Sequence, residues 1–148
     1  MSYHLRLAAT LTMLLVAAGF VGCGGSSLPA PVERLPGKWH GQMIVFEEEV
    51  QGKLTPDAIA ALGQSQMDYE FKPDGSMVVG VAINNKSESS QAKWELVKQD
   101  GDLLTIKSTE PGGKQEHINF EFDGADTFYM PVKNEIAELG AFRFTRLR

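Results

Sequence analysis

The chain has 148 residues, of which 43% are hydrophobic and 9% aromatic, which is enough for one globular domain and too few for two ordinary ones. Its 14 Lys and Arg residues are outnumbered by 19 Asp and Glu residues and are scattered, which excludes an extended basic groove for nucleic acid. The single cysteine, Cys23, excludes an internal disulfide and a cysteine-clustered zinc site.

The N-terminal segment, residues 1–22, has the pattern of a secretory signal peptide: a short polar start with Arg6, then a nearly continuous apolar stretch. The stretch is about 16 residues long, shorter than the roughly 20 that span a bilayer, and it ends directly before Cys23. The residues Phe20-Val21-Gly22-Cys23 resemble a bacterial lipobox, in which the cysteine is acylated and becomes the first residue of the mature protein. The resemblance implies a membrane anchor of acyl chains on Cys23. The alternatives are ordinary signal cleavage nearby and an uncleaved anchor.

The residues after Cys23 predict the membrane to which the protein is sorted and a flexible linker before the folded domain. Gly24 stands where an Asp would retain the protein in the inner membrane of enteric bacteria, so the resemblance favours the outer membrane of a bacterial cell envelope. The composition of residues 24–36, mainly Gly, Ser and Pro, is typical of a flexible linker. We therefore expect a signal peptide over residues 1–22, a flexible tether over 23–34 and one folded domain over 35–148.

The folded domain is a succession of short alternating runs separated by turn signals, which predicts an all-β fold. Alternation with a period of two residues is clearest over 92–96, 118–122 and 142–145. The helical signal is Thr55 as N-cap, Pro56 at the first helical position and Gly63 as a stop. The predicted strands are residues 38–47, 67–72, 76–83, 91–98, 103–108, 116–122, 127–132 and 141–147.

The connections between these strands alternate in length. Tight glycine-containing turns are predicted at residues 73–75, 99–102 and 123–126, and the other connections are longer. In an up-and-down meander, successive connections lie at opposite ends, so one end would be closed by turns and the other would open through loops. Eight strands closed into a barrel leave room for side chains or for one small ligand.

The start of the first strand, Gly37-Lys38-Trp39, resembles the Gly-x-Trp motif of the lipocalin and fatty-acid-binding superfamily. In that family the Trp packs across the closed end of the barrel against a basic residue near the end of the last strand, for which Arg146 is the matching candidate. The resemblance covers residues 35–148 and implies an eight-stranded up-and-down antiparallel barrel with one short helix between strands one and two. Pro131 departs from the pattern because it removes a hydrogen-bond donor, and it predicts incomplete closure between strands seven and eight.

An inward Trp39 sets which side chains fill the barrel. The aromatic ones gather near the tight turns and smaller ones near the loops, a taper typical of a cavity that opens between the loops. A fully packed core is the alternative. Strand three is apolar on both faces, so its register stays open. The expected interior is Gly41, Met43, Val45, Met67, Tyr69, Phe71, Trp94, Leu96, Leu104, Ile106, Ile118, Phe120, Phe122, Phe128, Met130, Val132, Phe142 and Phe144. The predicted ligand contacts are Met43, Val45, Met67, Tyr69, Ile106, Ile118, Phe120, Met130, Val132 and Phe142.

The remaining candidates indicate neither catalysis nor a metal. His40 and His117 are expected to point outward, and no ligand spacing joins them. The sequence contains no Gly-x-Ser-x-Gly motif and no phosphate-binding glycine loop, so we predict no enzymatic activity and no cofactor.

Two functions fit these observations. The first is a membrane-anchored lipoprotein whose barrel binds or carries a small apolar ligand, such as a fatty acid or another lipid-like molecule. The second is a solid-core interaction module, an inhibitor or envelope assembly factor, that binds a protein partner through the loops at residues 84–90 and 109–115. The presence of a cavity distinguishes them.

Overall fold

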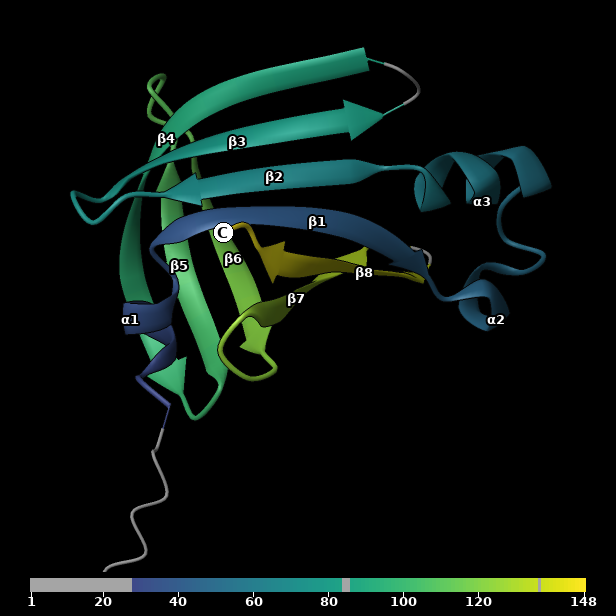
Figure 1. The fold of residues 1–148 in the computed structure, drawn as a ribbon. Helices are drawn as coiled ribbons and strands as arrows, with labels where there is room; N and C mark the ends of the chain where they lie inside the picture. Colours follow the sequence, from purple (N-terminus) through teal and green to yellow (C-terminus); the bar gives the residue numbers. More distant parts are fainter. Residues whose placement is uncertain (1–27, 84–85, 136) are drawn as a thin grey trace, which may run out of the picture.

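The computed structural model describes residues 28–83, 86–135 and 137–148. Eight antiparallel strands form a closed barrel in which each strand pairs with its neighbours in sequence and the last strand returns to the first (Figure 1). This confirms the predicted all-β, up-and-down barrel. The strands are β1 (Gly37–Val45), β2 (Gln66–Phe71), β3 (Ser76–Ile83), β4 (Lys86–Asp100), β5 (Leu103–Thr109), β6 (Gln115–Phe122), β7 (Thr127–Lys133) and β8 (Glu138–Arg146).

Three short helices lie at the two ends of the barrel (Figure 1). Helix α1 (Pro31–Arg34) lies at the end with the tight turns, which we call the closed end. Helices α2 (Glu47–Val50) and α3 (Pro56–Gly63) lie at the opposite end, the mouth. In the described part of the chain, none of the helices has the length and apolar character that crossing a membrane takes.

Helix α3 is the predicted helix, whereas α2 is a second helix between β1 and β2, where only one was expected. Helix α1 corrects the predicted extent of the tether. The hydroxyl of Thr55 accepts a hydrogen bond from the backbone N–H of Ala58 at 3.3 Å, as an N-cap does. Residues 31–34 were expected to be flexible, but they form α1, and Arg34 is only 7% exposed. The folded part therefore begins before residue 35.

The predicted loop at residues 84–90 is largely a strand. β4 begins at Lys86, and its first residues pair with β3 as far as Ile83↔Lys86. Residues 86–90 carry exposed polar side chains on both faces of the hairpin, so the sequence shows no alternation of apolar and polar residues there. The connection between β7 and β8 is also shorter than predicted, because β8 already begins at Glu138. Tight and long connections therefore do not alternate throughout the barrel.

The weak seam of the barrel lies between β6 and β7, not between β7 and β8 as predicted. β7 pairs with β8 along its whole length, whereas its pairing with β6 ends after Phe122↔Phe128 and Glu121↔Tyr129. A hydrogen bond between Asp123 N and Thr127 O at 2.9 Å shows that the odd-numbered residues of β7 direct their backbone groups toward β6. The nitrogen of Pro131 therefore faces β6 without a proton to donate, and the ladder stops before it.

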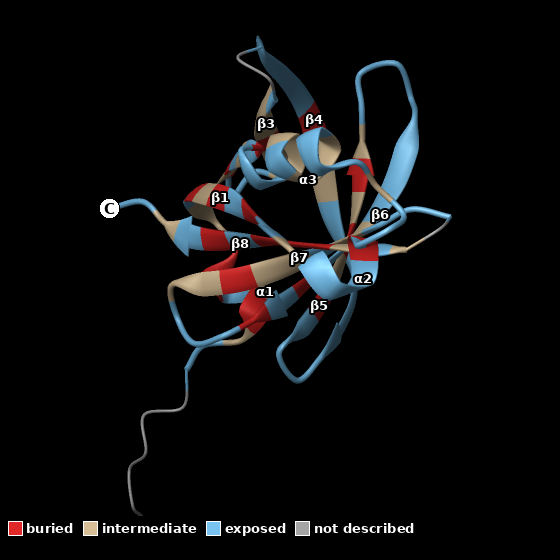
Figure 2. Ribbon diagram, turned by 90° about the vertical axis from the view of Figure 1, so that its right-hand side faces the viewer, coloured by how far each residue is buried: buried red, intermediate tan, exposed pale blue. Residues whose placement is uncertain are grey.

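Aromatic side chains fill the closed half of the barrel. The ring of Phe128 lies 4.6 Å from Trp39, 4.7 Å from Phe144 and 4.8 Å from Phe120, measured between ring centroids. Gly41 makes room for this cluster, because a Cβ at that position would lie 2.5 Å from the Phe144 ring. All eight strands of the barrel and its core cluster lie within residues 28–148 (Figure 2).

One residue of the predicted interior lies outside the core. Leu96 is 46% exposed, although its direct partner on β5, Ile106, is fully buried. The register of β4 shifts between Leu96 and Lys98, and a bulge of this kind re-aims the side chains of the strand beside it.

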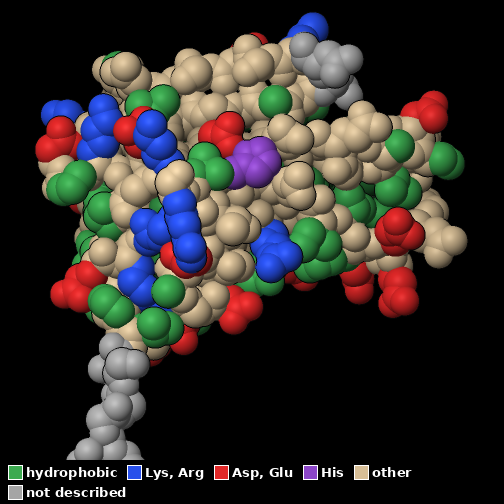
Figure 3. All heavy atoms as spheres, in the orientation of Figure 1, with side chains coloured by type: hydrophobic (Ala, Val, Ile, Leu, Met, Phe, Trp, Pro, Cys, Tyr) green, Lys and Arg blue, Asp and Glu red, His purple; other side chains and the backbone are tan. Residues whose placement is uncertain are grey.

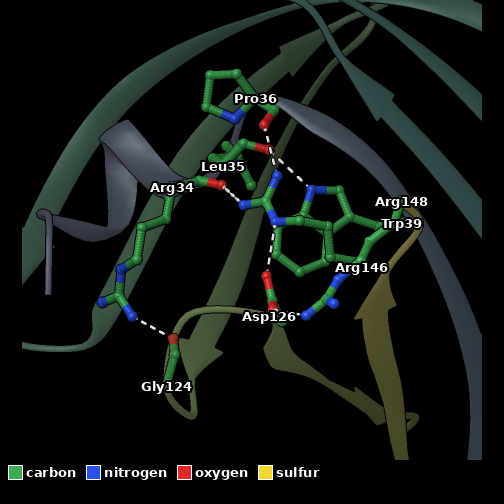
Figure 4. Close-up of polar contacts among 8 residues, drawn as sticks. All are labelled: Arg34, Leu35, Pro36, Trp39, Gly124, Asp126, Arg146 and Arg148. Carbon is green, nitrogen blue, oxygen red and sulfur yellow. Dashed lines mark hydrogen bonds and ion pairs between the residues drawn. The ribbon is translucent and has the colours of Figure 1, made fainter.

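The closed end is held by Arg146 near the end of the last strand (Figure 4). Its guanidinium carbon lies 4.2 Å from the centroid of the Trp39 ring. The same group donates hydrogen bonds to the carbonyl of Pro36 at 2.9 Å and to the carboxylate of Asp126 at 3.1 Å. The indole N–H of Trp39 donates to the carbonyl of Leu35 at 2.8 Å. These contacts join the start of the domain, the β6–β7 turn and the last strand.

A second arginine, Arg34, holds α1 against the closed end of the barrel (Figure 4). The guanidinium of Arg34 donates to the carbonyl of Gly124 and to the carboxylate of Asp102 at 2.9 Å, and it lies 4.8 Å from the ring of Phe122. The carbonyl of Arg34 in turn accepts a hydrogen bond from Arg146. Helix α1 is thus part of the closure of the barrel.

We expect Arg146→Lys to lower the free energy of unfolding by about 2 kcal/mol, because an ammonium lacks the planar fork that reaches several acceptors while stacking on Trp39. Urea denaturation measures the change. Arg143→Lys, at an exposed position of the same strand, is the matched control. Equal stability of the two variants would contradict the role given to Arg146.

Candidate ligand-binding chamber

The mouth half of the barrel encloses a hollow of about 680 Å³, here called the chamber. Its walls come from strands β2 to β8, and its size lies within the range of small-molecule sites. Its apolar lining is Met67, Met77, Val79, Ala92, Ile118, Met130, Pro131 and Val132. The fully packed core considered as an alternative is therefore found only in the closed half.

The predicted ligand contacts divide into two groups. Five of them line the chamber: Met67, Tyr69, Ile118, Met130 and Val132. The others, Met43, Val45, Ile106, Phe120 and Phe142, are absent from its lining and belong to the core or pack against it. Alternation predicts which face of a strand a residue occupies, but the depth of the residue in the barrel depends on the register of its neighbours.

The chamber also has lining residues that the sequence pattern did not predict. The register of β3 places Val79 opposite Tyr69 and Met77 opposite Phe71, so Met77 and Val79 face inward. On β5 the inward series continues past Ile106 to Ser108. Extending the alternation of β5 by one further period would have found Ser108, but its polar side chain carries no hydrophobic signal.

Three polar side chains of the lining are here called the polar corner: Tyr69, Ser108 and Glu116. Ser108 and Glu116 are direct partners across β5 and β6. The phenol of Tyr69 is 5% exposed and donates only to the sulfur of Met130, at 3.8 Å. Burial raises the pKa of the Tyr69 phenol, and the nearby negative charge of Glu116 raises it further. The strongest charge acting on this phenol is therefore negative.

The rim of the chamber carries further charges. Glu110 and Glu138 border it together with Lys133, and Glu110 also forms an ion pair with Lys114 at 3.5 Å. In the described residues, no group of three His, Cys, Asp or Glu side chains is placed to hold a metal ion. The rim is thus mixed in charge with an excess of carboxylates.

His40 and His117, the histidines within the described residues, lie on the surface. His40 contacts Asp68 across β1 and β2, with 2.6 Å between Nδ1 and Oδ1, and its side chain is 35% exposed. His117 is exposed on β6 and borders the chamber from the outside.

Comparison with known proteins gives one similar fold. No protein-family model and no curated protein matches this chain. The chain is similar to a solved structure of "As-p18, an extracellular fatty acid binding protein", with 12% sequence identity, a TM-score of 0.46, and coverage of 78% of this chain and 97% of that one. The barrel architecture of the present protein rests on its own strand pairing.

The raised pKa of Tyr69 predicts a loss of stability at alkaline pH. As the pH rises above 10.0, the ordinary pKa of tyrosine, the unfolded chain releases this proton while the folded chain keeps it. The free energy of unfolding should therefore fall by up to about 1.4 kcal/mol per pH unit from this group alone. Urea denaturation from neutral pH to about pH 11 measures this change. The free energy of unfolding should fall less steeply with pH for Tyr69→Phe than for the parent, and Glu116→Gln should lie between them. An equally steep decline for Tyr69→Phe would contradict the prediction.

Proposed function

We propose that this protein is a lipid-anchored protein of the bacterial cell envelope that binds a small, largely apolar molecule inside its barrel. The chamber carries the proposal, because it is a hollow whose lining combines eight apolar side chains with nine polar ones, as an amphiphile would require. Protein interiors are normally filled, and the closed half of this barrel shows that its side chains can pack densely.

The expected affinity follows from the area that such a ligand buries. Transfer of about ten methylenes from water to the chamber contributes roughly 8 kcal/mol, which corresponds to a dissociation constant near the micromolar range before the costs of association. Met67, Met77 and Met130 line the chamber, and their unbranched side chains can adapt to ligands of different shape. In this proposal the ligand is bound and released unchanged, without a catalysed reaction.

The proposed anchor would orient the barrel on its membrane. The described chain starts at the closed end beside α1, a few residues after Cys23, and the mouth lies at the opposite end (Figure 1). Most Lys and Arg side chains on the face shown in Figure 3 lie over the closed end. Several closed-end cations are paired with carboxylates, Arg34 with Asp102 and both Arg146 and Arg148 with Asp126, so the proposed orientation rests on the position of the chain start. The chamber would then open away from the anchoring membrane, toward the envelope space.

The alternative function, binding of a protein partner through two loops, has less structural support. Residues 86–90 belong to β4, and residues 110–114 form a turn closed by a hydrogen bond from Glu110 N to Lys114 O at 2.9 Å. The exposed apolar side chains Val97 and Leu103 lie elsewhere, on β4 and β5 toward the closed end.

We expect Ile118→Trp to abolish ligand binding without unfolding the barrel, because the larger side chain would occupy the chamber. The measurement is the fluorescence of N-phenyl-1-naphthylamine, an uncharged apolar probe, added to residues 24–148. Val97→Trp, at an exposed position outside the chamber, is the matched control and should bind like the parent. If the parent binds neither this probe nor any ligand seen by native mass spectrometry, the proposed function is wrong.

The anchor is tested on the full chain in a bacterium that processes lipoproteins. Labelled palmitate should be incorporated into the parent, which should be found with the membranes. Cys23→Ala should lose both the label and the membrane association, since the acyl chains attach to this thiol. Membrane association of the Cys23→Ala protein without label would instead indicate an uncleaved signal segment.

A further inference from the structure

We propose that the chamber selects amphiphiles with a cationic ammonium head group over fatty-acid anions, an inference that rests on the ligand-binding function proposed above. The polar corner of Tyr69, Ser108 and Glu116 would receive the head group, and the apolar lining would receive the chain.

The hydroxyl of Ser108 is the first observation that points to a ligand. Ser108 is only 7% exposed and borders the chamber, and its hydroxyl forms no hydrogen bond with any other residue in the described ranges. The oxygen is not shut off from solvent, so the hydroxyl is open to the chamber and can bond a ligand there. A polar group of the ligand would provide the missing partner.

The phenol of Tyr69 is similarly short of partners. Its contact is with the sulfur of Met130, a weak acceptor, at 3.8 Å. Both lone pairs of the phenol oxygen can therefore accept hydrogen bonds from a ligand. The two hydroxyl groups and the Glu116 carboxylate together offer mainly acceptors.

The charge at the polar corner decides between head groups. Glu116 lies opposite Ser108 in the ladder, at the exposed mouth end of the β6 series that continues inward through Ile118, and no cation among the described residues forms an ion pair with it. An ammonium group brings up to three donors and a positive charge to these acceptors, whereas a fatty-acid carboxylate brings acceptors and a negative charge.

The cations near the mouth do not reverse this preference. Lys133 is the one Lys or Arg side chain in the described lining of the chamber, and it comes from β7. Lys114 is paired with Glu110 on the turn above the rim. Glu116 is also near enough to the Tyr69 phenol for its negative charge to raise the pKa of that group, after the larger effect of burial.

The test uses residues 24–148 loaded with N-phenyl-1-naphthylamine and three competitors of equal chain length at neutral pH: dodecylamine and dodecanoate, each below its critical micelle concentration, and 1-dodecanol, below its solubility limit. We expect dodecylamine to displace the probe at a concentration about tenfold or more below that of dodecanoate, with 1-dodecanol between them. Glu116→Gln should remove most of this difference. Ser108→Ala should lower the affinity for dodecylamine and 1-dodecanol, so that higher concentrations of both are needed to displace the probe. Glu121→Gln, on the outward face of the same strand, is the matched control and should keep the selectivity of the parent.

The outcomes separate the two proposals. If the probe binds but dodecanoate competes as well as dodecylamine or better, the head-group inference is wrong and the binding function stands. The head-group inference is also wrong if Glu121→Gln reduces the selectivity as much as Glu116→Gln, because the preference would then come from the overall negative charge. If neither the probe nor any competitor binds, the binding function itself fails.

Discussion

The closed end of the barrel depends on the stacking of one guanidinium group on one indole ring. Arg146 lies over Trp39 and at the same time satisfies backbone carbonyls of the segment that leads into β1. These carbonyls would otherwise be partly buried without donors, which is costly. The stack joins the first strand, the last strand and the β6–β7 turn. In an up-and-down barrel the first and last strands become neighbours only when the barrel closes, so the stack stabilises the closed form.

The barrel is solid at this end and hollow at the other. Large rings such as Phe128 and Phe144 meet near the turns, and Gly41 allows the strands to surround them closely. Toward the mouth the inward positions hold smaller or flexible side chains, and the walls stay apart. The unpaired stretch between β6 and β7, beside Pro131, adds to this openness, because the chamber reaches both strands there. The densely packed core and the chamber therefore occupy opposite halves of one barrel.

The polarity of the chamber matters as much as its volume. An apolar cavity by itself would accept many lipid-like molecules, and the head group would then have little influence on affinity. In this protein the inward series of β5 and β6 end in a hydroxyl and a carboxylate, next to a buried phenol. A site of this kind favours a ligand that donates hydrogen bonds and carries no negative charge.

The amino-acid sequence by itself determined the strands, their order and the helix capped by Thr55, because alternation, turn glycines and capping are local signals. The contact between Trp39 and Arg146 was expected only from the resemblance of residues 37–39 to a family motif. The sequence did not reveal the strand character of residues 86–90, whose exposed polar side chains show no alternation. Only the tertiary structure decided where the seam lies. Pro131 has no backbone N–H, and whether the missing hydrogen bond falls on the β6 side or the β8 side depends on which neighbour the odd-numbered residues of β7 face. The tertiary structure also decided which inward residues line the chamber and that Ser108 and Glu116 stand opposite each other, because register between strands is a long-range property.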